Sequence, residues 1–243
     1  MNSIIFSIIT INYNNHLGLE KTIQSVVSQS FKSYEFIVID GGSNDGSSAC
    51  ISSHATQIHY WVSESDHGVY HAMNKGWKQA TGHYCIFLNS GDVFADVDVL
   101  KLVYELTDFT SDLVYGCHLW GSKDGERWNP KKDFRFREIL YHTPISHQAT
   151  FIKKAQLEKV GGFKSNYKII ADWGVLLDSM RMHARLQKIS LDVCIAEEAG
   201  VSNLSEKEVM KERSLYLLRH HFIAFFFNKY VVLPLINIIN KYK

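Results

Sequence analysis

Residues 62–92 read Val62-Ser-Glu-Ser-Asp-His-Gly-Val-Tyr-His-Ala-Met-Asn-Lys-Gly-Trp-Lys-Gln-Ala-Thr-Gly-His-Tyr-Cys-Ile-Phe-Leu-Asn-Ser-Gly-Asp92. This order of residue types predicts a turn, a helix over 69–80, a second turn, and a buried strand over 83–88 that stops at a polar tip. Open α/β sheets bind their ligands in the crevice just beyond the carboxyl ends of the strands. The tip Asn89-Ser-Gly-Asp92 therefore predicts a ligand site, and its carboxylate favours a charged substrate.

The same alternation of strand and helix runs along most of the chain. We expect further strands at 4–11, 34–40, 58–62, 113–117, 148–152 and 189–195. We expect further helices at 19–27, 100–106, 155–160 and 172–186, and a last helix that begins at the capping box Ser205-Glu-Lys-Glu208. This order predicts an α/β fold: a single Rossmann-like, doubly wound and mostly parallel sheet, with a less regular second half and a C-terminal helical segment.

Composition limits the class of protein and its partners. The chain has 243 residues, of which 46% are hydrophobic, and this is enough for a large folded core. Its 26 Lys and Arg residues balance 25 Asp and Glu residues, so no overall basic field favours nucleic acid, and we expect no nucleic-acid partner. The four cysteines show no CxxC spacing, and we expect them to be reduced core residues rather than disulfide or metal ligands.

The two ends of the chain bear on its location. Met1-Asn-Ser leads directly into the first strand without the basic and apolar regions of a signal peptide, so we expect a cytoplasmic protein. The apolar stretch 222–239 is interrupted by polar and charged residues and by Pro234, whereas a membrane span needs about 20 mostly apolar residues. Two interpretations stay open for this stretch. It lies in the interface at the inner face of the cytoplasmic membrane, or it packs on the domain or against a second copy in a homodimer.

Polar residues follow three of the expected strands. Asn12-Tyr-Asn14 ends the first, Asp40 and a glycine-rich turn end the second, and Asn89-Ser-Gly-Asp92 ends the fourth. The carboxyl ends of parallel strands share one edge of a sheet, so these residues should meet in one crevice that suits a nucleotide. The turn Gly41-Gly-Ser-Asn-Asp-Gly46 does not match the dinucleotide pattern GxGxxG. Asp40 suits hydrogen bonds from a base or ribose better than a pyrophosphate; an ordinary turn is the alternative.

Seven motifs, in order along the chain, carry a family resemblance. They are Phe6-Ser-Ile-Ile-Thr-Ile-Asn-Tyr-Asn14, Val38-Ile-Asp-Gly-Gly-Ser-Asn-Asp-Gly46, Asp66-His-Gly-Val-Tyr-His-Ala-Met-Asn-Lys-Gly76, Phe87-Leu-Asn-Ser-Gly-Asp92, Ser146-His-Gln-Ala-Thr-Phe151, Gly161-Gly-Phe163 and Ala171-Asp-Trp173. With these motifs the chain resembles the family-2 glycosyltransferases of the glycosyltransferase A fold, near the bacterial exopolysaccharide and colanic-acid enzymes. The resemblance covers residues 4 to about 203. It implies a catalytic domain over 1–204, with a nucleotide-sugar-binding half (1–118) and an acceptor-binding half (119–204), and a C-terminal helical extension over 205–243.

The resemblance implies inverting transfer of a sugar from a nucleotide diphosphate donor to a saccharide or lipid-linked acceptor during synthesis of a bacterial surface polysaccharide. It also implies the donor-site residues, which are Tyr13 and Asp40 at the base and ribose, Asp45 and Asp66 near the nucleotide, and Asn89 and Ser90 at the strand tip. The tip corresponds to the family's metal-binding acidic motif. Mg²⁺ or Mn²⁺ held there offsets the negative charge that builds on the departing diphosphate.

The tip departs from the family pattern in its number of acids. Asn89 and Gly91 stand at positions that are commonly Asp, so Asp92 is the one carboxylate of the motif. We therefore expect Asp92 to be the metal ligand, with Asn89 and His147 as further candidate ligands, and we expect the metal to bind together with the donor. The same departure favours an alternative function, a catalytically weak protein that binds a nucleotide sugar and serves as an assembly partner.

The transfer also needs a base that takes a proton from the acceptor hydroxyl. Asp172 matches the family's base position, and the alternative is an acid that is favoured at a helix N-terminus by the helix dipole. The resemblance suggests His147 near the diphosphate or acceptor, with a structural histidine as the alternative.

Two further interpretations concern Trp173 and the class of reaction. Trp173 is either a platform on which a sugar ring stacks or a residue of the core. Nucleotidyl transfer is disfavoured because Ser7 to Asn15 contains no basic residue for a triphosphate.

Overall fold

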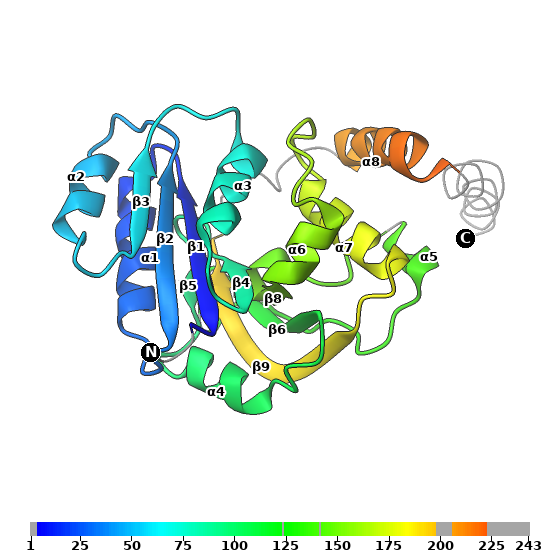
Figure 1. Ribbon diagram of the computed structural model, residues 1–243, viewed down its shortest axis with the longest axis horizontal. Coiled ribbons are helices and arrows are strands. Elements are labelled where there is room, and N and C mark those ends of the chain that lie inside the picture. The colour runs from blue at the N-terminus through cyan, green and yellow to red at the C-terminus, as the bar shows by residue number, and fades with distance from the viewer. Residues whose placement is uncertain (1–3, 123, 141, 198–205, 223–243) are drawn as a thin grey trace.

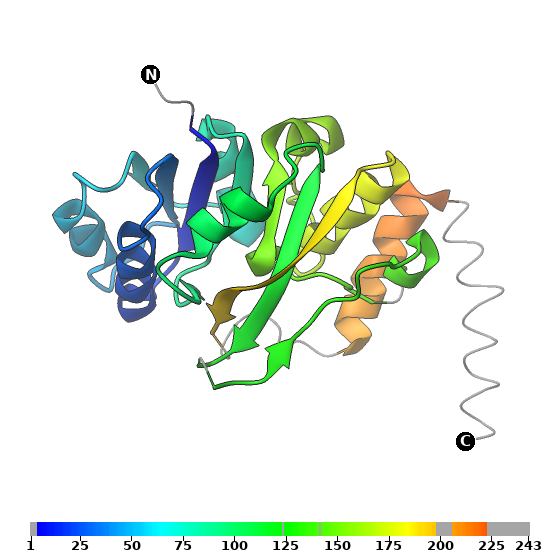
Figure 2. The ribbon, with the colours of Figure 1, turned by 90° about the horizontal axis from the view of Figure 1, so that it is seen from below.

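The computed structural model describes residues 4–122, 124–140, 142–197 and 206–222, and Figures 1 and 2 show its ribbon from two directions. The strands are β1 Phe6–Asn12, β2 Tyr34–Asp40, β3 Tyr60–Ser63, β4 Tyr84–Phe87, β5 Val93–Phe94, β6 Leu113–Trp120, β7 Arg127–Trp128, β8 Thr150–Lys153 and β9 Leu186–Ala196. The helices are α1 His16–Val27, α2 Ser47–Ser53, α3 Val69–Gln79, α4 Val99–Leu106, α5 Phe136–Ile139, α6 Lys154–Val160, α7 Ala171–Arg181 and α8 Glu206–His220, with a 3₁₀ turn at His147–Ala149.

The described strands form one sheet in the order β3-β2-β1-β4-β8-β6-β9-β5, with β7 paired to β6. β3, β2, β1 and β4 are parallel, which is the Rossmann-like half that the sequence predicts. β8 is antiparallel to both of its neighbours, β4 and β6, while β6 and the long, curved β9 are parallel (Figure 2). The expected α/β sheet, mostly parallel and less regular in its second half, is confirmed.

Helices cover both faces of this sheet, because the central strands are apolar on both faces. Along β1, Phe6 and Ile8 point into one buried cluster while Ile9 and Ile11 point into the other. The first cluster is completed by residues of α1, α2 and α4, and the second by residues of α3, α5, α6, α7 and α8. The sheet is therefore doubly wound, and its strand ends emerge between two helical layers.

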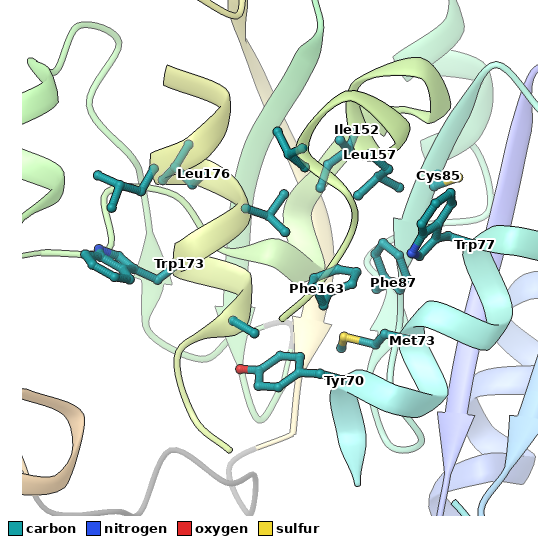
Figure 3. Close-up of a cluster of buried hydrophobic side chains, with 14 of the residues drawn as sticks. Tyr70, Met73, Trp77, Cys85, Phe87, Ile152, Leu157, Phe163, Trp173 and Leu176 are labelled. Atoms are coloured by element: carbon teal, nitrogen blue, oxygen red, sulfur yellow. The ribbon is translucent and has the colours of Figure 1, made fainter. Parts of the chain in front are cut away.

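The second cluster joins the two halves of the chain directly behind the strand ends. Figure 3 shows Tyr70 and Met73 of α3 beside Phe87 of β4 and Phe163, with Trp173 on the neighbouring helix α7. The rings of Phe87 and Phe163 meet edge to face with their centroids 4.9 Å apart. This packing fixes α3 and α7 relative to each other, and both helices carry side chains of the candidate site.

Some expected boundaries were wrong for local reasons. The helix expected over 172–186 ends at Arg181, because His183 adopts a left-handed conformation (φ 56°) and the chain turns into β9. The strand expected over 148–152 begins only at Thr150, after the 3₁₀ turn. The four cysteines are free and buried, as expected of core residues.

Helix α8 packs against α7. The Tyr216 hydroxyl donates to Oδ2 of Asp178 at 2.7 Å, and the Glu212 carboxylate accepts hydrogen bonds from the backbone N–H groups of Lys168 and Ile169, just before α7. The described part of the expected C-terminal extension is thus packed onto α7 and the residues just before it. No helix in the described ranges is long and apolar enough to cross a membrane, and the apolar stretch beyond residue 222 lies outside those ranges.

Candidate active site at the strand ends

Hydrogen bonds tie the ends of β1, β2 and β4 together, as the sequence predicts for one shared crevice. The side-chain amide of Asn12 donates to Oδ1 of Asp40 at 2.7 Å, and the Ser90 hydroxyl donates to Oδ1 of Asn12 at 2.7 Å. Asn12 and Asp40 are paired in the register of β1 and β2, and both are buried. The three polar segments therefore form one connected structure, in which Asn12 is the central residue that the sequence did not single out by itself.

Asp40 is fully buried and organises the turn that follows β2. Its carboxylate accepts hydrogen bonds from the backbone and hydroxyl of Ser43 and from the hydroxyl of Ser63, in addition to Asn12. Burial alone would raise the pKa of Asp40, but these hydrogen bonds hold it below its usual value, so the carboxylate is charged. Gly42 and Asn44 of the turn are exposed, so the turn faces solvent while Asp40 supports it from below.

Tyr13 and Asp66 lie together above Gly41. A Cβ atom placed on Gly41 would be 3.0 Å from Oδ2 of Asp66 and 3.2 Å from Cδ2 of the Tyr13 ring. The Tyr13 ring is 69% exposed, and Oδ1 of Asp66 accepts a 2.8 Å hydrogen bond from the backbone of Gly68. The structure thus brings these two predicted residues together. An exposed aromatic ring lies beside a carboxylate, and both side chains lie over Gly41, which has no side chain of its own.

Asp45 is exposed and holds the starts of two helices. Its Oδ2 accepts a 2.8 Å hydrogen bond from the backbone of His16, and its Oδ1 accepts from the backbone and hydroxyl of Ser47. These bonds join the start of α1 to the start of α2. Carboxylates are favourable at such N-termini, so the described contacts of Asp45 have a structural explanation.

Asp92 closes the tip of β4 and is 4% exposed. Its Oδ2 accepts a hydrogen bond from the backbone of Asn89 at 3.2 Å, and its Oδ1 accepts one from the backbone of Glu197 at 3.0 Å. Burial raises the pKa of Asp92 to about 6, and the negative charge of Glu197 acts in the same direction. Glu197, the residue that follows β9, thus lies at the tip of β4.

Asp172, in the first turn of α7, is held by two donors from distant parts of the chain. Nδ1 of His147 lies 3.1 Å from Oδ2 of Asp172, and the Tyr70 hydroxyl lies 2.9 Å from Oδ1 and 2.6 Å from the carbonyl oxygen of Ile169. On its other side, Nε2 of His147 lies 3.5 Å from the Asn89 amide. A chain of side chains therefore runs from the strand tip to Asp172. Tyr70 belongs to the 66–76 motif, which was the sequence signal for it.

The shifts in pKa favour the charged forms of both His147 and Asp172. Burial works against the charge on His147, but its hydrogen bond to Asp172 raises the pKa of the imidazole, and the charges of Asp172 and Asp92 add to this. Burial likewise opposes the charge on Asp172, but the bonds from His147 and Tyr70 hold the pKa of its carboxyl below the usual value. The side chains of His147 and Asp172 are each about one-fifth exposed, so the pair is reachable from solvent.

Trp173 belongs to the core. It is 1% exposed, its Nε1 donates to the carbonyl oxygen of Ile139 at 2.6 Å, and the guanidinium of Arg213 lies 5.0 Å from its ring centroid. Both the ring faces and the N–H group are therefore occupied by the protein itself. Of the two interpretations of Trp173, the core residue is the correct one.

The tip offers a partial set of metal ligands. Across the described ranges, no group of three or more His, Cys, Asp and Glu side chains is placed to hold a metal ion. Oδ1 of Asn89, however, is buried and has no hydrogen-bond partner, and Asp92 lies three residues away. An amide and a carboxylate oxygen fit a hard divalent cation that takes its other ligands from phosphate and water, as Mg²⁺ commonly does.

Comparisons with known proteins bear on the family to which the chain belongs. The model of the family described as glycosyl transferase family 2 matches residues 7–166. An uncharacterized glycosyltransferase of Mycobacterium tuberculosis is 34% identical over 183 residues, which is 70% of this chain and 67% of that protein. A PGL/p-HBAD biosynthesis glycosyltransferase of Mycobacterium bovis is 29% identical and shares 85% of this chain and 82% of its own length.

Two solved structures share the fold. The crystal structure of Staphylococcus aureus TarS superposes with a TM-score of 0.71 and 19% identity over 88% of this chain but only 39% of that longer chain. The mannosyltransferase PcManGT of Pyrobaculum calidifontis, solved in complex with GDP-Man and Mn²⁺, gives a TM-score of 0.63 and 20% identity over 88% of this chain and 62% of its own. The family model covers well over half of the sequence, and the chain therefore belongs to glycosyltransferase family 2.

Proposed function

We propose that the protein is an inverting glycosyltransferase that moves a sugar from a nucleotide diphosphate donor to a saccharide or lipid-linked acceptor in bacterial surface polysaccharide or glycolipid synthesis. The observation that carries this proposal is the arrangement of His147, which contacts Asp172 through one ring nitrogen and lies beside Asn89 of the strand tip through the other. A candidate base and a candidate diphosphate site are thus neighbours. Support for the class of product comes from the mycobacterial relative, which is named for PGL/p-HBAD biosynthesis.

The donor nucleotide is proposed to lie over Gly41, between the Tyr13 ring and Asp66. An exposed aromatic face suits stacking with a base, and a carboxylate suits the hydroxyl groups of a ribose. In this arrangement Asp40 and Asp45 support the turn under the nucleotide, and Ser90 and Asn89 lie toward the diphosphate. TarS has been solved in complex with UDP-GlcNAc and PcManGT in complex with GDP-Man, which supports a nucleotide sugar as the donor.

The metal is proposed to be Mg²⁺ or Mn²⁺ at Asp92 and Asn89, with His147 beside it. When bound, such a cation would offset the negative charge on the departing diphosphate. The protein's own part is to hold Asp92 in place, through the backbone N–H groups of Asn89 and Glu197, and to leave Oδ1 of Asn89 without a competing partner. Support for the ion comes from the Mn²⁺ in the PcManGT complex.

Asp172 is proposed to take the proton from the acceptor hydroxyl as that oxygen attacks the sugar. His147 and Tyr70 orient the carboxylate by holding both of its oxygens, and they keep it ionised and able to accept a proton. A single displacement, with the base on one side of the sugar and the diphosphate on the other, inverts the configuration at the anomeric carbon.

The proposed function is tested by turnover. Purified protein is incubated with a panel of nucleotide sugars, Mn²⁺ and saccharide acceptors, and the release of nucleoside diphosphate is measured together with the thermal shift caused by each donor. Selective stabilisation by one donor, followed by release of its diphosphate, supports the enzyme. The alternative, a binding and assembly partner, is favoured by the single carboxylate in the tip motif. Binding of a donor without release with any acceptor would support this alternative.

Replacing Asp92 by Ala should weaken donor binding only when metal is present. The substitution removes the proposed ligand, so we expect the affinity for UDP or GDP in Mn²⁺ to fall by about 10- to 100-fold and to approach the affinity measured in EDTA. Titration calorimetry with and without Mn²⁺ gives both values. An affinity in Mn²⁺ equal to that of the wild type would contradict the assignment of Asp92 to the metal.

We also propose that the C-terminal end attaches the protein to a membrane surface. Leu215, Leu218 and Phe222 are exposed on one side of α8 and its end, where an apolar face suits an interface, and the rest of the apolar stretch lies outside the described residues. Deletion after His221 should therefore move the protein from the membrane fraction to the soluble fraction. A truncated protein that instead changes only from dimer to monomer, measured by analytical ultracentrifugation, would favour packing between copies.

A further inference from the structure

Gly91, where the family commonly carries an acid, has its side-chain position filled by another part of the chain. A Cβ atom added to Gly91 would overlap the side-chain carboxylate of Glu197. Gly91 has φ +103°, a conformation that favours glycine. The tip thus lacks its own acid at residue 91, and a carboxylate from residue 197 stands in the same place.

The register of the sheet explains why Glu197 arrives there. β5 and β9 are antiparallel, with Val93 opposite Ile195 and Phe94 opposite Cys194. Each step toward the tip along β5 corresponds to one step toward the C-terminus along β9, so the same register sets residue 91 opposite residue 197. The strand pairing therefore brings the backbone of residue 197 to the tip, and the side chain of Glu197 makes the contact with Gly91.

Local hydrogen bonds hold Glu197 in this position. Its backbone N–H donates to Oδ1 of Asp92 at 3.0 Å, and its Oε2 lies 3.4 Å from the side-chain amide of Asn15. The same amide donates to the carbonyl oxygen of Ser90 at 3.1 Å, while Oδ1 of Asn15 caps α1 by accepting from Gly18. Residue 197 is thus linked to the tip motif at two points, to Asp92 through its backbone N–H group and to Ser90 through the side chain of Asn15.

Glu197 is more accessible to solvent than Asp92. Asp92 is 4% exposed, and both of its oxygens already accept backbone hydrogen bonds. Glu197 is exposed and, with Gly91, lines an open groove of about 520 Å³. The groove, which Lys21 also lines, opens the carboxylate of Glu197 to solvent, and the unpartnered Oδ1 of Asn89 belongs to the same tip motif.

We propose that Glu197 supplies the second carboxylate of the metal–diphosphate site, replacing from β9 the acid that Gly91 lacks. This inference rests on the proposed function, because it concerns how that donor site holds its cation. Two carboxylates, one amide oxygen and the donor's phosphate oxygens make a ligand set suited to Mg²⁺ or Mn²⁺. Residues 89–92 contain only one acid, Asp92, but Glu197 adds a second carboxylate at the same place in the fold.

The test is the variant Glu197→Gln, which keeps the size of the side chain, its contact with Asn15 and the backbone bond to Asp92. Binding of UDP and GDP is measured by calorimetry in Mn²⁺ and in EDTA, and binding of Mn²⁺ in the presence of nucleotide is followed by electron paramagnetic resonance. We expect the affinity in Mn²⁺ to fall by about 10- to 100-fold. In EDTA we expect it to stay equal or to rise, because a negative charge near the diphosphate has been removed.

Glu105→Gln is the matched control, since Glu105 is exposed on α4 and its substitution changes the net charge by the same amount. It should leave binding in both conditions at the wild-type level. Nucleotide affinity of Glu197→Gln that is unchanged in Mn²⁺, or changed equally in Mn²⁺ and EDTA, would overturn the inference. Failure of the wild-type protein to bind any nucleotide would instead overturn the proposed function itself.

Discussion

The Asp172→Asn protein is expected to transfer sugar about 10²- to 10⁴-fold more slowly than the wild type, with donor affinity close to normal. The amide cannot take the proton from the acceptor hydroxyl, yet it has nearly the same shape as the carboxylate. Asp172 contacts His147 and Tyr70 rather than the residues around Gly41, so its loss should leave the proposed nucleotide site in place. Single-turnover rates at saturating donor give the effect on chemistry, and calorimetry with the donor gives the effect on binding.

Asp178→Asn is the matched control for this experiment. Asp178 lies on the same helix, but its carboxylate contacts Tyr216 and His221 at the packing surface of α8. We expect this variant to lose stability while its transfer rate stays near that of the wild type. If Asp172→Asn keeps its activity within a few-fold, or loses no more than Asp178→Asn, then Asp172 is not the base.

Trp173→Ala is expected to lower the free energy of unfolding by about 3–5 kcal/mol. The indole is almost fully buried, so its removal leaves a large cavity and exposes the carbonyl oxygen of Ile139 without its donor. The ring also packs against Tyr216 of α8, with centroids 5.6 Å apart, and against the guanidinium of Arg213. Urea unfolding followed by circular dichroism measures the loss.

Trp61→Ala is the matched control, because it removes a tryptophan that is partly exposed instead of one that is buried. Trp61 is 37% exposed on β3, the edge strand of the sheet, so its replacement should change stability far less, by about 0.5 kcal/mol if it behaves as a surface site. Equal losses for the two variants would contradict the core position of Trp173. A loss of stability at Trp173 in a protein that still binds nucleotide would confirm that the residue stabilises the packing of α7 and α8 without contacting the nucleotide.

The first half of the site could be predicted because its signals are local. Buried apolar runs followed by Asn12, Asp40 and Asn89 mark strand ends, and parallel strands bring such ends together. The resemblance added Asp172, which the sequence alone would have left as an ordinary acid at a helix start. The structure then confirmed that these segments converge, and the assignment of roles to them stays a prediction.

The other contacts of the site could not be predicted, because they join residues about 100 positions apart and no local sequence pattern encodes them. Tyr70 reaches Asp172 across 102 residues, and Glu197 reaches Asp92 across 105. The second contact follows from the register between β5 and β9, and the two-residue strand β5 is too short to leave a periodic signal. The end of α7 was missed for a different reason, since His183 adopts a left-handed turn without the glycine that usually announces one.

The pairing of β5 has a consequence for how the chain can be divided. β5 comes early in the sequence, within the half that the resemblance assigns to the nucleotide sugar, yet among the described strands it pairs only with β9, from the other half. A fragment that stops at residue 118 would contain Tyr13, Asp66 and Asp92, but it would leave β5 without a neighbour and Oδ1 of Asp92 without its donor. The two halves named from the resemblance are therefore not separable units of structure, because the last described strand pairs with β5 and supplies a hydrogen bond to Asp92.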